Sequence, residues 1–141
     1  MSYLLDTNVI SELRKPAGRA HEGVRRWTAE QSPSGLYLSS ITVLEIELGI
    51  RRLARRDEGR AARLLTWLED DVLDVFAGRV LPVDVAVARQ AADLHVPDPR
   101  PERDALIAAT AIVHGLTVVT RNVRDFADSR VKVLDPWEAD A

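Results

Sequence analysis

The sequence contains no cysteine, few aromatic residues and no long hydrophobic run. Without cysteine in its 141 residues, the chain can form neither a disulfide framework nor a structural zinc site of cysteine and histidine. No apolar run approaches the roughly 20 residues of a membrane-spanning helix. Asp6 and Asn8 also interrupt the apolar start where a signal peptide has its hydrophobic region. These absences predict a cytoplasmic protein with no membrane partner.

The length and the hydrophobic content fit one globular domain. A chain of 141 residues, 46% of them hydrophobic, can build one core and leaves no room for a second domain. We therefore expect a single domain over residues 1–141. The net charge of −3 lacks the basic excess that is typical of nucleic-acid-binding proteins, so any such role has to depend on the local distribution of charge.

Four short apolar segments are typical of strands buried on both faces of a parallel sheet: residues 3–5, 36–38, 117–119 and 131–134. Longer segments with helical periodicity separate them, and between residues 44 and 76 they predict a helical hairpin broken near Asp57 to Gly59. Alternating strands and helices form right-handed crossovers. The expected fold class is α/β, with a central, mostly parallel sheet of four to five short strands and helices on both faces.

Four acidic residues are expected at one edge of this sheet. Asp6 follows the first strand, and Glu45 lies just inside the helix after the second. Asp104 opens the helix that leads to the strand at 117–119, and Asp125 lies in the turn beyond that strand. All four would therefore converge at the carboxyl edge, where open α/β sheets bind their ligands. Converging carboxylates repel one another, by roughly 4 kcal/mol for a pair about 4 Å apart, unless a cation lies between them.

Each acid also has a structural interpretation. Asp6 could cap a helix, Glu45 could form a capping box with Thr42, and Asp104 could favour the first turn of its helix through the dipole. The convergence of all four is harder to explain in this way. Because carboxylates and water suit hard cations, the expected cofactor is Mg²⁺, for which Mn²⁺ could substitute. One or two such ions would activate a water molecule against a phosphodiester.

Four segments of this chain resemble the PIN-domain family, and within it the VapC and FitB type of ribonuclease toxin from toxin-antitoxin pairs. They are residues 4–13 (LLDTNVISEL), 39–49 (SSITVLEIELG), 103–111 (RDALIAATA) and 118–126 (VVTRNVRDF). These segments span nearly the whole chain in the order found in the family. The resemblance implies a PIN-like fold.

By resemblance, Asp6, Glu45 and Asp104 match the three acids that usually form the family's metal site. Asp125 matches a fourth, more variable acid. Thr7 and Thr120 match supporting hydroxyls near the site, and Asn122 falls where some relatives have another polar residue. Asp125 and Asn122 could instead simply stabilise the turn that follows the strand, Asn122 by closing an Asx turn. The predicted catalytic and metal-binding residues are therefore Asp6, Glu45, Asp104 and Asp125, supported by Thr7, Thr120 and Asn122.

Basic residues close to these acids in the sequence are candidate RNA or antitoxin contacts. They are Arg14 and Lys15 after the first helix, and Arg51, Arg52 and Arg55 towards the end of the helix that carries Glu45. Such residues could hold phosphates beside the acidic site. They could equally form a solvated helix face with local ion pairs.

The resemblance implies a Mg²⁺-dependent endoribonuclease that is the toxic component of a type II toxin-antitoxin pair of the VapBC kind. Its implied partners are an RNA substrate and a cognate VapB-like antitoxin that inhibits it. We also expect a homodimer, because similar toxins pair through helices and the helical middle of this chain is rich in apolar residues. Two alternatives remain open: a PIN-domain nuclease of RNA processing without an antitoxin, and a non-catalytic binding module with the PIN fold. A phosphoryl-aspartate enzyme is a poor match, because neither Lys15 nor Lys132 follows a later strand at the carboxyl edge.

Overall fold

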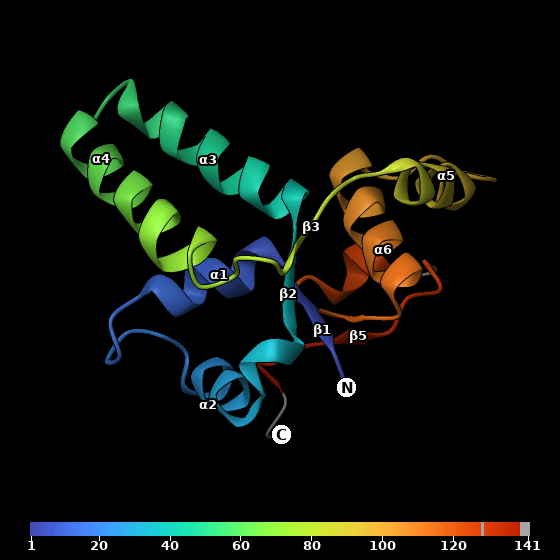
Figure 1. Ribbon diagram of the computed structural model, residues 1–141, viewed down its shortest axis with the longest axis horizontal. Helices are drawn as coiled ribbons and strands as arrows, with labels where there is room; N and C mark the ends of the chain where they lie inside the picture. The colour runs from blue at the N-terminus through green and yellow to red at the C-terminus, as the bar shows by residue number, and fades with distance from the viewer. Residues whose placement is uncertain (128, 139–141) are drawn as a thin grey trace.

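A five-stranded parallel sheet forms the centre of the computed structural model, which describes residues 1–127 and 129–138 (Figure 1). Its strands are β1 (Tyr3–Leu5), β2 (Leu36–Ser39), β3 (Val80–Leu81), β4 (Thr117–Val119) and β5 (Val133–Leu134). They lie in the order β3-β2-β1-β4-β5, and every neighbouring pair is parallel. The predicted α/β class and parallel sheet are confirmed. Sequence analysis missed β3 and placed the start of β5 two residues too early.

Helices cover both faces of the sheet, as predicted. The α-helices are α1 (Thr7–Arg14), α2 (Glu22–Glu30), α3 (Ser40–Ala54), α4 (Glu58–Trp67), α5 (Val85–Leu94) and α6 (Glu102–His114). Three short helical turns, η1 (Pro33–Gly35), η2 (Leu68–Leu73) and η3 (Val123–Phe126), complete the fold. In Figure 1, α1 to α4 lie on one side of the sheet, and α5 and α6 lie on the other.

Alternating side chains of the central strands divide the core into two clusters. Leu5 packs in a cluster with residues of α1 to α4, whereas its neighbour Leu4 packs in a second cluster with residues of α5 and α6. Val119 and Val118 divide between the same two clusters. All four side chains are fully buried, and each such burial stabilises the fold by roughly 1.5–3 kcal/mol. The two clusters fix the strands, and with them the carboxyl edge, between the two helical layers.

Local signals explain where α4 begins and where α6 ends. Asp57 caps α4 by accepting a hydrogen bond from the backbone N–H of Arg60 at 3.1 Å. The predicted break between α3 and α4 near Asp57 to Gly59 is thereby confirmed. The last helix, α6, ends at His114 because Gly115 adopts the left-handed conformation, with φ of 67°.

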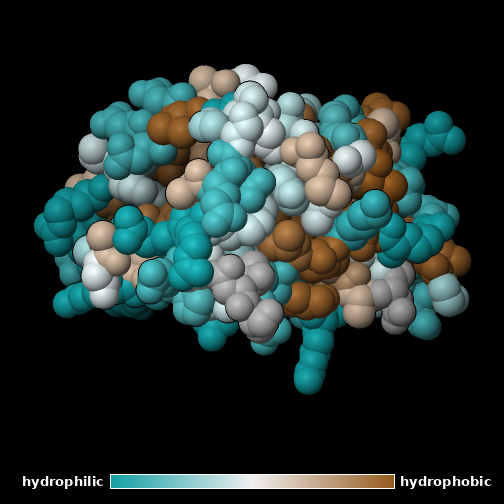
Figure 2. Space-filling model, turned by 90° about the horizontal axis from the view of Figure 1, so that it is seen from below, coloured by the Kyte–Doolittle hydropathy of each residue, from teal (hydrophilic) through white to brown (hydrophobic). Residues whose placement is uncertain are grey.

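The molecular surface seen from below Figure 1 is mostly hydrophilic, with hydrophobic residues in separate small patches (Figure 2). None of the described helices has both the length and the apolar character that crossing a membrane requires.

Candidate metal centre

Three of the predicted acids, Asp6, Glu45 and Asp104, line one cavity of about 460 Å³ at the carboxyl edge of the sheet. Asp6 follows β1 directly, Glu45 lies on α3 after β2, and Asp104 lies in the first turn of α6 before β4. The predicted supporting residues Thr7 and Asn122 line the same cavity. Asp125 lies outside this lining, on the exposed turn η3. The topology therefore brings acids from three distant segments to one place.

Asp6 is both a helix cap and a member of the acidic site. Its Oδ1 accepts a hydrogen bond from the backbone N–H of Thr7 at 2.8 Å, and its Oδ2 accepts one from Oγ1 of Thr120 at 2.8 Å. The residue is 6% exposed. Burial raises its pKa, the two hydrogen bonds oppose that shift, and the charges of Glu45 and Asp125 add to it. The capping interpretation is thus correct for Asp6, although capping leaves the repulsion from the other acids unexplained.

Glu45 does not form the capping box that its spacing from Thr42 suggested. The cap of α3 is Ser39, whose Oγ accepts from the backbone N–H of Ile41 at 3.0 Å, so Glu45 lies beyond the first turn. Instead, Oε1 of Glu45 accepts a hydrogen bond from Oγ1 of Thr7 at 2.7 Å. Its Oε2 lies 3.8 Å from Nη1 of Arg103. Thr7 therefore connects Glu45 to Asp6, because its backbone binds one carboxylate and its hydroxyl binds the other.

Asp104 is the acid with the fewest partners. Within the described part of the chain, its carboxylate accepts no hydrogen bond and pairs with no cation. Burial raises the pKa of Asp104 to about 6, and the charges of Asp125, Asp6 and Glu45 contribute. The cap of α6 is Pro101, which makes no side-chain capping bond. Its position in the first turn places Asp104 favourably for the helix dipole, yet burial and, after it, the neighbouring carboxylates raise its pKa against that effect.

The hydroxyl of Thr120 organises the centre of the site. Thr120 is fully buried, donates to Asp6, and accepts from Nδ2 of Asn8 at 3.2 Å and from the backbone N–H of Asn122 at 3.0 Å. The Oδ1 atom of Asn8 accepts in turn from the backbone N–H of Arg121 at 3.3 Å. Asn122 begins η3 without a side-chain capping bond, so the Asx-turn interpretation is not supported.

The chemistry of this donor set suits a hard divalent cation. The acids offer only oxygen, and among the described residues Arg103 is the one cation in an ion pair with any of them, at 3.8 Å from Glu45. Within residues 1–127 and 129–138, no three acidic or histidine side chains close around one point. Mg²⁺ binds through one or two carboxylates and keeps several water molecules, so the oxygen donors that line this cavity are of the kind it takes. The cavity leaves room for those waters.

The predicted basic contacts separate into two groups. Arg14 and Lys15 line the acidic cavity. Arg51 pairs with Glu47 at 2.8 Å and lines a different groove on α3. Arg52 and Arg55 are exposed near the end of α3, and neither lines the acidic cavity.

Sequence analysis missed Glu12, Arg121 and Trp137, which also line the cavity. The position of Arg121 directly after Thr120 was a signal that could have identified it. Trp137 offered no comparable signal, because its approach depends on the path of the chain after β5.

Known proteins resemble this chain over nearly its whole length. The PIN domain family model matches residues 3–132. VapC ribonuclease Y4jK from Sinorhizobium fredii is 39% identical, over 96% of this chain and 97% of the relative. Toxin FitB from Neisseria gonorrhoeae is 40% identical, over 95% of this chain and 97% of the relative. The crystal structure of FitAcB from the same organism matches with a TM-score of 0.86 and 38% identity, over 96% of this chain and 98% of that one. The chain belongs to the PIN domain family.

Proposed function

We propose that this protein is a divalent-metal-dependent endoribonuclease and the toxin of a toxin-antitoxin pair. The observation that carries the proposal is the carboxylate of Asp104, which lies beside Asp6 and Glu45 in one cavity and has neither a hydrogen-bond donor nor a cation as partner. A stable fold has little reason to keep such a group unless a ligand neutralises it. The full-length similarity to a VapC ribonuclease and to a FitB toxin supports the choice of reaction.

Asp6 and Asp104 would hold the metal, which we propose to be Mg²⁺ with Mn²⁺ as a substitute, and Glu45 and Asp125 would bind it directly or through water. A divalent ion at this place lowers the pKa of a bound water and neutralises negative charge that develops on the phosphate. The chain's own hydroxyls orient the carboxylates: Thr120 fixes Oδ2 of Asp6, and Thr7 fixes Oε1 of Glu45. No side-chain nucleophile is needed.

A cognate antitoxin of the VapB kind is the expected protein partner, since a ribonuclease toxin must be inhibited in the cell that makes it. We further propose that two copies of this chain pair through α3. An apolar groove there is lined by Ser40, Val43, Leu44, Glu47, Leu48 and Arg51, and Leu44 is 46% exposed. Val43, Leu44 and Leu48 lie together in this groove, and a contiguous apolar surface is typical of a contact surface.

Two alternatives make different predictions. A nuclease of RNA processing would cut RNA with the same metal, but its expression alone would not arrest growth and no small inhibitor gene would adjoin its own. A non-catalytic PIN-fold module would bind RNA without cutting it. The unpartnered Asp104 favours catalysis over that second alternative.

The proposal is tested by cleavage of RNA with Mg²⁺ and after EDTA is added, using Asp104→Asn and the matched control Glu102→Gln. Both substitutions remove one negative charge from the first turn of α6, but Glu102 is exposed and does not line the cavity. We expect Asp104→Asn to lose orders of magnitude in rate, because several kcal/mol of charge stabilisation are lost, and Glu102→Gln to keep nearly full activity. If the two variants cleave at equal rates, Asp104 acts only as a helix-dipole residue and the proposal fails.

A further inference from the structure

Beside the acids, a second wall of the site is formed by Glu12, Lys15, His21, Arg121 and Trp137. All of these except His21 line the cavity itself. The order of the strands places this wall to one side: Glu45 follows β2 and Asp6 follows β1, whereas Arg121 follows β4 and Trp137 follows β5.

Arg121, like Arg14, is a cation of the cavity with no carboxylate partner among the described residues. Lys15 donates from Nζ to Oε1 of Glu12 at 2.9 Å, and the guanidinium of Arg14 lies 5.9 Å from the ring centre of Trp67. The described residues include no carboxylate paired with Arg121. Its exposed guanidinium can bind an anion without first breaking an ion pair.

Contacts at both ends hold Arg121 in place. Its backbone N–H donates to Oδ1 of Asn8 at 3.3 Å, beside the acidic site. Its guanidinium carbon lies 5.4 Å from the ring centre of Trp137, within the range of a cation–π contact. The backbone N–H of Trp137 donates to Oδ1 of Asp135 at 2.9 Å. Because the indole supports the arginine, less side-chain entropy is lost when the guanidinium binds a ligand.

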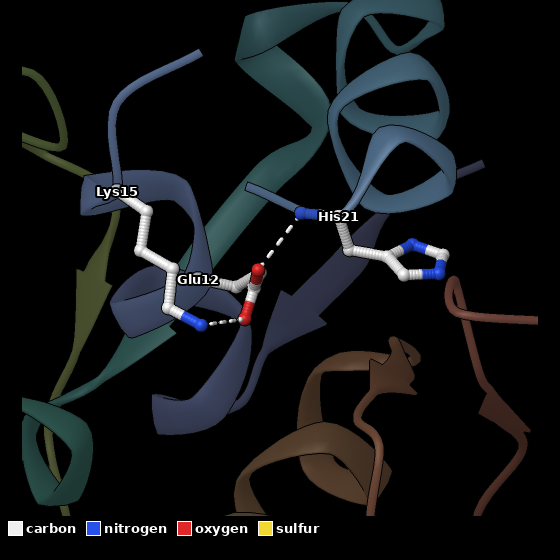
Figure 3. Close-up of polar contacts among 3 residues, drawn as sticks. All are labelled: Glu12, Lys15 and His21. Carbon is white, nitrogen blue, oxygen red and sulfur yellow. Dashed lines mark hydrogen bonds and ion pairs between the residues drawn. The ribbon is translucent and has the colours of Figure 1, made fainter. Parts of the chain in front are cut away.

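Glu12 supports the wall from behind. This carboxylate, in a residue 8% exposed, accepts from the backbone N–H of His21 at 2.8 Å as well as from Lys15 (Figure 3). These contacts hold the pKa of Glu12 below its ordinary value, with Lys15 as the main cause. The imidazole of His21 points away from Glu12 in Figure 3, and its ring centre lies 6.2 Å from that of Trp137. Glu12 thereby fixes the start of α2 at His21, whose ring lies beside the indole that supports Arg121.

We propose that Arg121, supported by Trp137, binds a phosphate of single-stranded RNA next to the phosphodiester that the acids address. This inference depends on the proposed nuclease function and adds the residue that positions the substrate. The register pairs Leu5 with Val119, so Asp6 and Thr120 are neighbours and Arg121 follows at once. Adjacent strands lie about 4.8 Å apart, so an RNA strand that crosses this edge reaches Arg121 directly after the acids. A cation beside an aromatic ring is typical of sites for single-stranded nucleic acid.

Binding of a fluorescein-labelled single-stranded RNA of random sequence tests the inference. Arg121→Gln and Arg89→Gln are compared on an Asp104→Asn background, which binds RNA without cutting it. Arg89 is an exposed residue of α5 that does not line the cavity, so the control removes the same charge elsewhere. We expect Arg121→Gln to weaken binding about tenfold, as for one lost charge-assisted contact. It should also lower the slope of log K against log salt by about 0.7, the value for one phosphate contact, while Arg89→Gln changes neither quantity.

Kinetics in the otherwise unaltered protein separate positioning from a structural role. Arg121→Gln should raise KM and leave kcat and the melting temperature nearly unchanged, because the contact forms equally with substrate and transition state. Arg121→Lys should restore most of the salt slope. If Arg121→Gln matches Arg89→Gln in affinity, slope and KM while RNA is still cut, this inference is wrong and the proposed function stands. That result would overturn the inference even if Arg121→Gln weakened the binding of a protein partner, because the proposed ligand of Arg121 is RNA. If the unaltered protein cuts no RNA with Mg²⁺ or Mn²⁺, the proposed function itself fails.

Discussion

Replacing Thr120 by valine removes the hydroxyl that joins three parts of the site while keeping nearly the same shape. The fully buried Oγ1 donates to Asp6 and accepts from Asn8 and from the backbone of Asn122. Valine leaves these three groups without their partner. Because Asn8 and Asn122 line the cavity, water there can reach their freed N–H groups, and only part of the cost of an unpaired buried group applies. We expect the free energy of unfolding to fall by about 2–3 kcal/mol.

The same substitution should weaken metal binding. The hydrogen bond from Thr120 lowers the pKa of Asp6 against the effect of burial, so its loss raises that pKa further. A metal ion then has to displace a proton from Asp6 over a wider range of pH. Titration with Mn²⁺ should therefore show a lower affinity in Thr120→Val than in the unaltered protein, with the difference increasing as the pH falls.

Thr42→Val provides the matched control. Thr42 is also fully buried, but its Oγ1 has no hydrogen-bond partner among the described residues. Removing an unpartnered buried hydroxyl should leave stability unchanged or increase it by about 1 kcal/mol. Urea denaturation followed by tryptophan fluorescence measures both variants. The reasoning is refuted if Thr120→Val stays within about 0.5 kcal/mol of the unaltered protein, or if Thr42→Val loses as much stability as Thr120→Val.

Two further predictions concern pH and assembly. The pKa of Asp104 is raised from 3.8 to about 6 on folding, so its contribution to stability is complete below pH 3.8 and is lost as the pH rises through about 6. After allowance for screening of this partly exposed group, the free energy of unfolding of the metal-free protein should fall by about 1 kcal/mol more than that of Asp104→Asn across this pH range. Equal pH profiles of the two proteins in urea denaturation would contradict the prediction. Light scattering should give about twice the chain mass of 15.7 kDa, and Leu44→Glu should give the monomer, because it places a charge in the exposed groove of α3. A monomer in the unaltered protein at micromolar concentration would refute pairing through α3.

The parts of the fold that the sequence predicted are those with a strong local pattern. The segments of β1 and β4 are apolar on both faces, and the structure buries them between two layers of helices. β3 was missed because it consists of two half-buried residues at the edge of the sheet, too few to produce a periodic pattern. The predicted strand at 131–134 was too long because only Val133 and Leu134 form the strand that pairs with β4.

For the candidate site, topology alone was enough to bring Asp6, Glu45 and Asp104 to one cavity. The capping box assigned to Thr42 and Glu45 was wrong because helix α3 begins at Ser40, with Ser39 as its cap, and a residue spacing does not fix where a helix starts. The contact between Arg121 and Trp137 could not be predicted, since it depends on how the chain turns after β5.

Calorimetric titration with Mn²⁺ of the unaltered protein and of Asp6→Asn tests most directly whether a divalent metal ion binds at this edge of the sheet. Asparagine can still cap α1, because its side-chain oxygen can accept from the backbone N–H of Thr7 as Asp6 does at 2.8 Å. The fold should therefore survive while one negative charge is lost from the cavity. We expect clear binding by the unaltered protein and at least about tenfold weaker binding by Asp6→Asn. Equal affinity in the two proteins, or no binding by either, would contradict a metal centre at this edge of the sheet.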